Sequence, residues 1–174
     1  MRGLALRRLV VIFSLPVALV AMAWSGGAAS ADSPHFIRAS ASLSGVNLVV
    51  SFKEAVLGTN QLINYTASAN ATATYVCVNK GGGNPSASNK TSSQGPVSAS
   101  GTFSSGKNGS VNASLTVTPP PVPATFSCPP GQKLETAQVT YTGVSITDTT
   151  HGVSEPISGT FTTGCLLPNV RGAC

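Results

Sequence analysis

The sequence predicts an all-β protein, a single antiparallel β-sandwich of immunoglobulin-like or Greek-key type with about eight strands and two disulfides. Short runs rich in Val, Ile, Thr and Tyr alternate apolar and polar residues, which is the period of a strand with one buried face. Gly, Pro and Asn separate these runs at fairly regular intervals. After residue 31, no apolar pattern of helical period is long enough to predict a helix.

The chain begins with the pattern of a secretory signal peptide. Three arginines precede an apolar run over residues 9–24, and Ala29-Ser30-Ala31 has the small-residue form of a cleavage site. The alternative, a retained membrane anchor, needs about 20 apolar residues. The run here is shorter and contains a serine and a proline. We therefore predict cleavage before Asp32 and no membrane span in the exported chain.

Export changes the charge of the chain. Three of the ten Lys and Arg lie in the signal segment, so seven remain against five Asp and Glu, a net charge of +2. These charges are isolated, so no basic patch for nucleic acid is expected. We expect a signal peptide at 1–31, a β-sandwich domain at 32–164 and a disulfide-closed tail at 165–174. The expected location is secreted, either extracellular or associated with the cell envelope.

Four cysteines, Cys77, Cys128, Cys165 and Cys174, lie in the exported part, where an even number predicts two disulfides. Three pairings are open. We favour Cys77 with Cys128, which ties a strand to a proline-rich corner, and Cys165 with Cys174, which closes a short tail. Zinc is the alternative, but no pair has C-x-x-C spacing and the two histidines are far apart in the sequence. Neither a metal nor a cofactor is therefore expected.

Turn residues bound each expected strand. The strands expected at residues 62–68 and 71–79 form a predicted hairpin, as do those at 97–104 and 110–117, which Lys107-Asn108-Gly109 would connect. Between these two hairpins, the segment from Lys80 to Pro96 contains three consecutive glycines and is expected to be a long exposed loop. The expected strands cover residues 36–43, 46–53, 62–68, 71–79, 97–104, 110–117, 137–148 and 157–162.

The stretch over residues 126–148 joins a cysteine, a Pro129-Pro130-Gly131 corner and the longest β-type run. The two prolines fix φ and remove two backbone donors, so the chain must turn there. Beyond the corner, Ala137 and Tyr141 share one face, but after Gly143 the apolar residues occupy even positions. A change of phase by one residue at a glycine predicts a β-bulge or a tight bend.

Residues suited to catalysis are sparse. The acids are scattered singly and no G-x-S-x-G motif is present. Asp148, His151 and Glu155 lie close together around one predicted turn and are the best candidates for a metal or acid–base site. The alternative is a solvated hairpin turn, the common outcome for polar residues in such a place. No catalytic or cofactor-binding residue is assigned, and we predict that the protein is not an enzyme.

A binding surface is easier to reconcile with this composition. Ser- and Thr-rich strand faces, together with Tyr65, Tyr75 and the loop over residues 80–96, would form a flat polar surface for a glycan or a protein. Five Asn-x-Ser/Thr sequons fit surface positions and would carry glycans only in a eukaryotic secretory route. These sequons begin at Asn64, Asn70, Asn89, Asn108 and Asn112.

Three segments carry a resemblance to known proteins. They are SFKEAVLGTN from Ser51 to Asn60, ATATYVCVNKGGG from Ala71 to Gly83, and FSCPPGQ from Phe126 to Gln132. The chain resembles uncharacterised small secreted proteins of actinobacteria over most of its exported length. The resemblance implies a secreted β protein with disulfides. It implies no activity and no functional residues.

We therefore expect a secreted, non-enzymatic β-sandwich that acts as an extracellular or cell-envelope binding or structural module. A cell-wall glycan or an extracellular protein would be its partner. The alternatives are a secreted hydrolase and an extracellular enzyme inhibitor. A hydrolase requires a concave site in which His35 or His151 meets an acid. An inhibitor requires a stiff protruding loop, for which Pro119 to Cys128 is the candidate segment.

Overall fold

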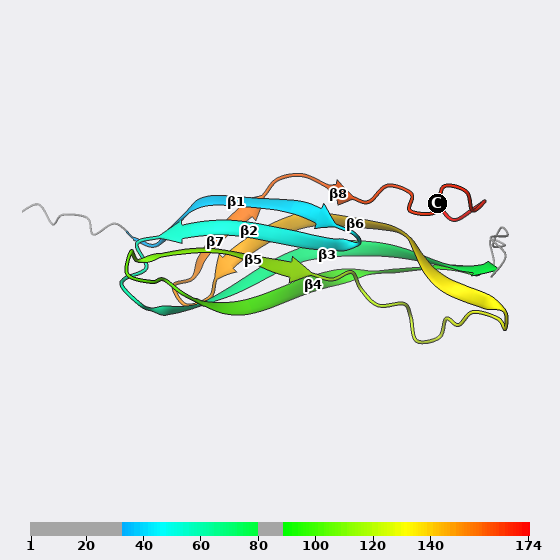
Figure 1. Cartoon of the computed structure of the whole chain (residues 1–174), viewed down its shortest axis with the longest axis horizontal. Helices are drawn as coiled ribbons and strands as arrows, with labels where there is room; N and C mark the ends of the chain where they lie inside the picture. Colours follow the sequence, from blue (N-terminus) through cyan, green and yellow to red (C-terminus); the bar gives the residue numbers. More distant parts are fainter. Residues whose placement is uncertain (1–32, 80–88) are drawn as a thin grey trace, which may run out of the picture. The chain divides into compact units, whose positions relative to one another are not determined.

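Two antiparallel sheets face each other across a common core in the computed structural model, which describes residues 33–79 and 89–174 (Figure 1). The predicted signal peptide and residues 80–88 of the predicted loop lie outside the described residues. The described part of the chain contains no α-helix, and hence no helix of a length and hydropathy that would cross a membrane. The predicted all-β sandwich with eight strands and two disulfides is confirmed.

The smaller sheet, sheet A, has the strand order β1-β2-β5, and the larger sheet, sheet B, has the order β4-β3-β6-β7 with β8 also paired to β6. Sheet A strands have 8 to 10 residues, whereas β3, β4 and β6 have 15 to 18, so sheet B continues beyond sheet A (Figure 1). The bounds are β1 His35–Ser44, β2 Asn47–Ala55, β3 Leu62–Asn79, β4 Lys90–Ser104, β5 Ser110–Val117, β6 Gln132–Asp148, β7 Val153–Ile157 and β8 Phe161–Thr162.

The core lies between the sheets and is built on strict alternation. Every odd position of β3 from Ile63 to Tyr75 is buried, so the even positions form the outer face of sheet B. Phe52 of β2 stacks in a tilted geometry on Tyr65 of β3, with ring centroids 4.5 Å apart, and meets Phe103 of β4 edge-on at 6.0 Å. The aromatic rings therefore join strands of both sheets.

Sheet B extends beyond the end of sheet A, and there the proline-rich segment after β5 lies along the inner face of sheet B. The hydroxyl of Tyr75 donates a hydrogen bond to the carbonyl of Pro120, and Cys77 forms the predicted disulfide with Cys128. The segment predicted as a protruding inhibitor loop is thus attached to β3 near both of its ends. The hydroxyl of Tyr141 donates to the carbonyl of Val46 at 2.8 Å, and burial raises the pKa of Tyr141 to about 12.

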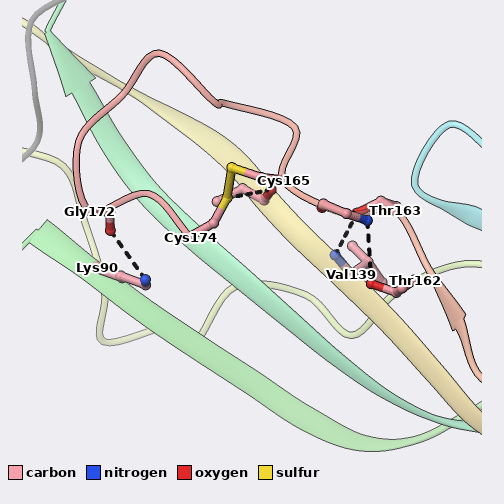
Figure 2. The surroundings of a disulfide bond; sticks show 9 residues. Lys90, Val139, Thr162, Thr163, Cys165, Gly172 and Cys174 are labelled. Atoms are coloured by element: carbon pink, nitrogen blue, oxygen red, sulfur yellow. Dashed lines mark hydrogen bonds between the residues drawn. A yellow bond between two sulfur atoms is a disulfide. The ribbon is translucent and has the colours of Figure 1, made fainter.

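The tail after β8 is closed by the predicted Cys165–Cys174 disulfide and lies against sheet B (Figure 2). The backbone N–H of Thr163 donates to the carbonyl of Val139 at 3.0 Å, and the N–H of Val139 donates to the hydroxyl of Thr163 at 3.1 Å. Ala173 is fully buried in a second apolar cluster with Val76 and Ala137. The tail therefore covers apolar side chains that the main core leaves outside.

The bulge predicted at Gly143 is confirmed. Ser68 pairs with Ser145 but Asn70 pairs with Thr142, and Gly143 has a φ of 59°. Glycine suits this position because a side chain disfavours positive φ. A second register shift, after Thr74, places Ala137 in the tail cluster instead of on the core face with Tyr141.

Two predicted hairpins are wrong. Residues 62–79 form the single strand β3, because β4 and β6 pair with it on both sides and keep Asn70 extended. Strands β4 and β5 do not pair; β4 joins β3 in sheet B and β5 joins β2 in sheet A. Their apolar faces meet across the core, and alternation along a strand is the same whether its neighbour lies beside it or opposite.

Two boundaries also differ from the prediction. Lys90 to Pro96 belong to β4, so this part of the predicted loop is a strand. The predicted last strand at 157–162 is divided into β7, which ends at Ile157, and the two-residue β8. Gly159 lies between them with a φ of 123°, a value that breaks the extended chain.

Candidate functional site

Asp148 and His151, two of the three predicted site residues, meet in the turn after β6. Oδ2 of Asp148 lies 2.6 Å from Nδ1 of His151, and Oδ1 accepts the backbone N–H groups of Thr150 and His151 at 2.7 and 3.0 Å. The Asp148 side chain is fully buried and that of His151 is 33% exposed. This carboxylate therefore closes the turn and fixes the imidazole ring.

Glu155, the third predicted residue, does not join them. It pairs with Ile146 across β6 and β7, is exposed, and forms no hydrogen bond or ion pair with the described residues. Within residues 33–79 and 89–174, no three His, Cys, Asp or Glu side chains are grouped in a way that could hold a metal ion. The predicted trio is thus a turn-closing pair and a separate edge carboxylate.

Sequence reasoning missed Glu54, the last polar residue of β2. Its side chain is fully buried, and neither carboxyl oxygen has a hydrogen-bond partner among the described residues. Glu54 continues the inward series of Leu48, Val50 and Phe52, so the period-2 pattern read to the end of β2 would have found it.

Burial raises the pKa of Glu54, and several neighbours modify this effect. The adjacent Tyr65 hydroxyl lowers the pKa, the charge of Asp148 raises it, and His151 and His35 lower it. Tyr65 pairs with Asp148 across β3 and β6, which places these side chains at one end of the core. A carboxyl buried without a partner favours the neutral, protonated form.

The prediction of an exposed platform on Tyr65 and Tyr75 is wrong. Their exposed fractions are 0% and 8%. The hydroxyl of Tyr65 has no hydrogen-bond partner in the described structure, and burial followed by the neighbouring Glu54 raises its pKa. Because Glu54 and Tyr65 are both inaccessible, this cluster cannot contact a substrate, although it can respond to pH.

The part of the outer face of sheet B that is centred on residues 64–74 of β3 is a different kind of surface, here called the hydroxyl face. The next row, in which Val76 pairs with Lys90 and Glu135, lies outside it. Residues that pair directly across strands project on the same side of a sheet, so the register places polar side chains in rows across four strands. None of them is charged or aromatic. The hydroxyl face comprises Asn64, Thr66, Ser68, Asn70, Thr72 and Thr74 of β3, Ser92, Gln94, Pro96, Ser98, Ser100 and Thr102 of β4, Gln138, Thr140, Thr142, Ser145 and Thr147 of β6, and Ser154 and Pro156 of β7.

At the end that carries Asn64 and Thr66, side chains of the hydroxyl face bond to each other. The hydroxyls of Thr66 and Ser100 lie 2.8 Å apart, and those of Thr147 and Ser154 lie 2.9 Å apart. The hydroxyl of Thr102 donates to Oδ1 of Asn64 at 2.6 Å. These cross-strand bonds fix the side chains without a layer of covering residues.

The centre of the hydroxyl face is open and its polar groups are unpaired. Two adjoining depressions, of about 390 and 290 Å³, share Asn70 as a lining residue. The side chains of Asn70, Thr72, Gln94 and Thr142 form no hydrogen bond with any described residue. A Cβ at Gly143 would lie 3.4 Å from Nδ2 of Asn70, an ordinary contact distance, so the bulge glycine lies beside this amide. The centre therefore offers donors and acceptors to a ligand.

Comparison with known proteins leaves this geometry as the guide to function. No family model, curated protein or solved structure matches the chain.

Proposed function

We propose that the protein is a secreted, non-enzymatic binding module that adheres to a neutral cell-wall glycan through the hydroxyl face. The observation that carries the proposal is the pair of adjoining depressions around Asn70, where amides and hydroxyls stay unpaired, whereas hydroxyls of the row through Thr66 bond to each other. Unpaired donors and acceptors on a rigid sheet suit a ligand that is itself covered with hydroxyl groups.

A neutral glycan is favoured by the charge of the surface. The hydroxyl face has no Lys, Arg, Asp or Glu, so it provides no attraction for phosphate or for an acidic polymer. It also has no exposed aromatic ring for stacking on a sugar. Binding would therefore rest on many hydrogen bonds, direct or through water, along a repeating polymer.

Secretion into an oxidising compartment is supported by the two formed disulfides and by the signal-peptide pattern at residues 1–31. The resemblance to small secreted proteins of actinobacteria favours a bacterial wall as the target. If export follows this route, intact-mass spectrometry of the protein recovered from the medium will give a chain that begins at Asp32 with no free thiol. A chain that retains residues 1–31 would contradict the assignment.

The architecture favours an immunoglobulin-like relationship. A constant-type immunoglobulin domain places its first, second, fifth and fourth strands in one sheet. Here β4 pairs with β3 in place of β5, and the remaining order, β1-β2-β5 against β3-β6-β7, is the same. Moving one strand enlarges the sheet that carries the hydroxyl face.

Replacing both central amides tests the proposal. The double variant Asn70→Ala/Gln94→Ala is expected to bind insoluble cell-wall glycan about tenfold more weakly, because each hydrogen bond contributes about 0.5–1.5 kcal/mol. The measurement is the fraction of protein that cosediments with purified cell walls over a range of wall concentrations. Because the face is uncharged, the bound fraction of the parent chain in roughly 0.5 M NaCl is expected to be about the same as at low salt.

The matched control is Ser51→Ala/Ser114→Ala, which removes two hydroxyls from one row of sheet A's outer face. It is expected to bind as the parent chain does. No retention on any neutral wall glycan, or equal retention of both double variants, would reject the proposal.

A further inference from the structure

We propose that two copies of the chain pair through the free edge of β4, antiparallel about Ser100, so that sheet B continues from one copy into the other. Strand β4 is the outermost strand of sheet B beside β3 (Figure 1). On its other side, β4 forms no backbone hydrogen bond with any described residue. The half of β4 from Val97 to Ser104 is the half farther from Asn79, the residue at which β3 ends.

The register shows which backbone groups face outward. Pro96 pairs with Asn70 in an uninterrupted ladder, and a proline within an edge strand directs its missing N–H away from the neighbouring strand. Hydroxyl contacts between β3 and β4 also occur at even positions of β4, such as Ser100, as expected for the non-hydrogen-bonded pairs. The N–H and C=O groups of Ser98, Ser100 and Thr102 therefore face the free side.

The opposite side of the sandwich carries features that block strand addition. Strand β7 has only five residues and includes the charged Glu155 and Pro156. Strand β1, which lies beside β7, has a register shift at Ile37 followed by Arg38. Short length, charge, proline and bulges are the usual protection of a sheet edge. From Thr91 to Ser104, β4 has no charge, and its neighbour across the core on this side, β5, has none either.

A second copy fits this edge better than an unrelated peptide does. Pairing about Ser100 sets Ser98 opposite Thr102 of the other copy, so small hydroxyl side chains meet and no like charges oppose each other. Pro96 then lies opposite Ser104, where its absent donor affects only the last rung. A foreign peptide would need side-chain pockets for its specificity, and the small residues from Ala99 to Gly101 line neither of the two depressions.

The twofold axis of this pairing is perpendicular to sheet B. The two hydroxyl faces would consequently lie on the same side of one continuous sheet. The dimer would double the area that is presented to a flat partner.

The test compares two matched lysine variants by sedimentation equilibrium of the oxidised protein. Ser100 and Ser154 lie at opposite ends of one row, both are exposed, and each bonds to a threonine hydroxyl. In the dimer, Ser100→Lys sets two lysines directly opposite each other, whereas Ser154→Lys changes the far edge. We expect the parent chain and Ser154→Lys to dimerise alike, and Ser100→Lys to dimerise at least about tenfold more weakly.

An equimolar mixture of Ser100→Lys and Ser100→Glu is expected to restore the dimer, because opposite charges then face each other. Circular dichroism and urea midpoints of both lysine variants establish that each is folded. A parent chain that stays monomeric at millimolar concentration would overturn the proposal. So would a dimer that both lysine variants weaken equally, or a charge pair that restores nothing. Glycan is absent throughout, so the outcome is independent of the proposed function.

Discussion

Removal of the Cys77–Cys128 disulfide is expected to lower the free energy of unfolding by about 4 kcal/mol, the largest effect of any pairwise change considered. The two cysteines are 51 residues apart, so the bond confines a long segment of the unfolded chain. It also attaches the proline-rich segment to β3 where sheet A no longer covers sheet B. Residues 33–79 and 89–174 contain no tryptophan and their core is rich in alanine, so the fold has little apolar surface to replace this contribution.

The measurement is urea denaturation of Cys77→Ala/Cys128→Ala, followed by tyrosine fluorescence and far-UV circular dichroism. The matched control is Cys165→Ala/Cys174→Ala, whose bond spans a separation of only 9 residues and is expected to contribute about 2.7 kcal/mol. An equal or larger loss in this tail variant would contradict the chain-entropy explanation.

Replacement of Glu54 by glutamine is expected to stabilise the protein by about 1–3 kcal/mol at pH 8, because it removes a buried carboxyl that has no partner. Glutamine has the shape of the protonated acid and cannot ionise. Its amide remains beside the Tyr65 hydroxyl, the neighbour that lowers the pKa of Glu54.

The sign of the pH dependence follows from the raised pKa of Glu54. In the unfolded chain this carboxyl ionises near its ordinary pKa of about 4.3, whereas in the folded chain burial keeps the proton bound to higher pH. The Glu54 contribution to stability is therefore complete below about pH 4 and is lost as pH rises through the folded pKa. The stability difference between Glu54→Gln and the parent chain should widen over this range, by at most about 1.4 kcal/mol per pH unit.

Urea unfolding of both chains between pH 3 and 9 measures this difference, with about one measurement per pH unit. The control is Glu155→Gln, an exposed carboxylate on β7, for which a flat difference is expected. A stability difference for Glu54→Gln that does not change with pH would show that the carboxyl ionises as readily in the folded chain as in the unfolded one.

The features that the sequence predicts correctly are local. Alternation locates the strands, and the change of phase at Gly143 locates the bulge because both need only a few neighbouring residues. The favoured one of the three open disulfide pairings is also confirmed. It rested on local features, the nine-residue separation of Cys165 and Cys174 and the proline corner beside Cys128. The Asp148–His151 contact spans one turn and was found for the same reason.

The features that the sequence missed depend on which strands are neighbours. Alternation in β4 and β5 gives each an apolar face but does not say whether the two faces lie beside each other or opposite across a core. The hydroxyl face exists only because β4, β3, β6 and β7 are adjacent in sheet B, an order that no run of residues encodes. Glu54 meets Tyr65 and Asp148 for the same non-local reason. Tyr65 and Tyr75 were misplaced because their parity alone does not reveal which face is covered.

The Tyr141 hydroxyl of sheet B forms a hydrogen bond to the turn between β1 and β2. The Tyr75 hydroxyl, also of sheet B, forms one to the proline-rich segment that follows β5. A tangential force that slid one layer over the other would have to break both of these bonds together, instead of one after the other. A molecule held to a wall by its broad face meets this kind of load whenever fluid moves past the surface. Under the proposed adhesion to a wall, the pair of tyrosines would thus give the protein mechanical resistance that equilibrium unfolding does not measure.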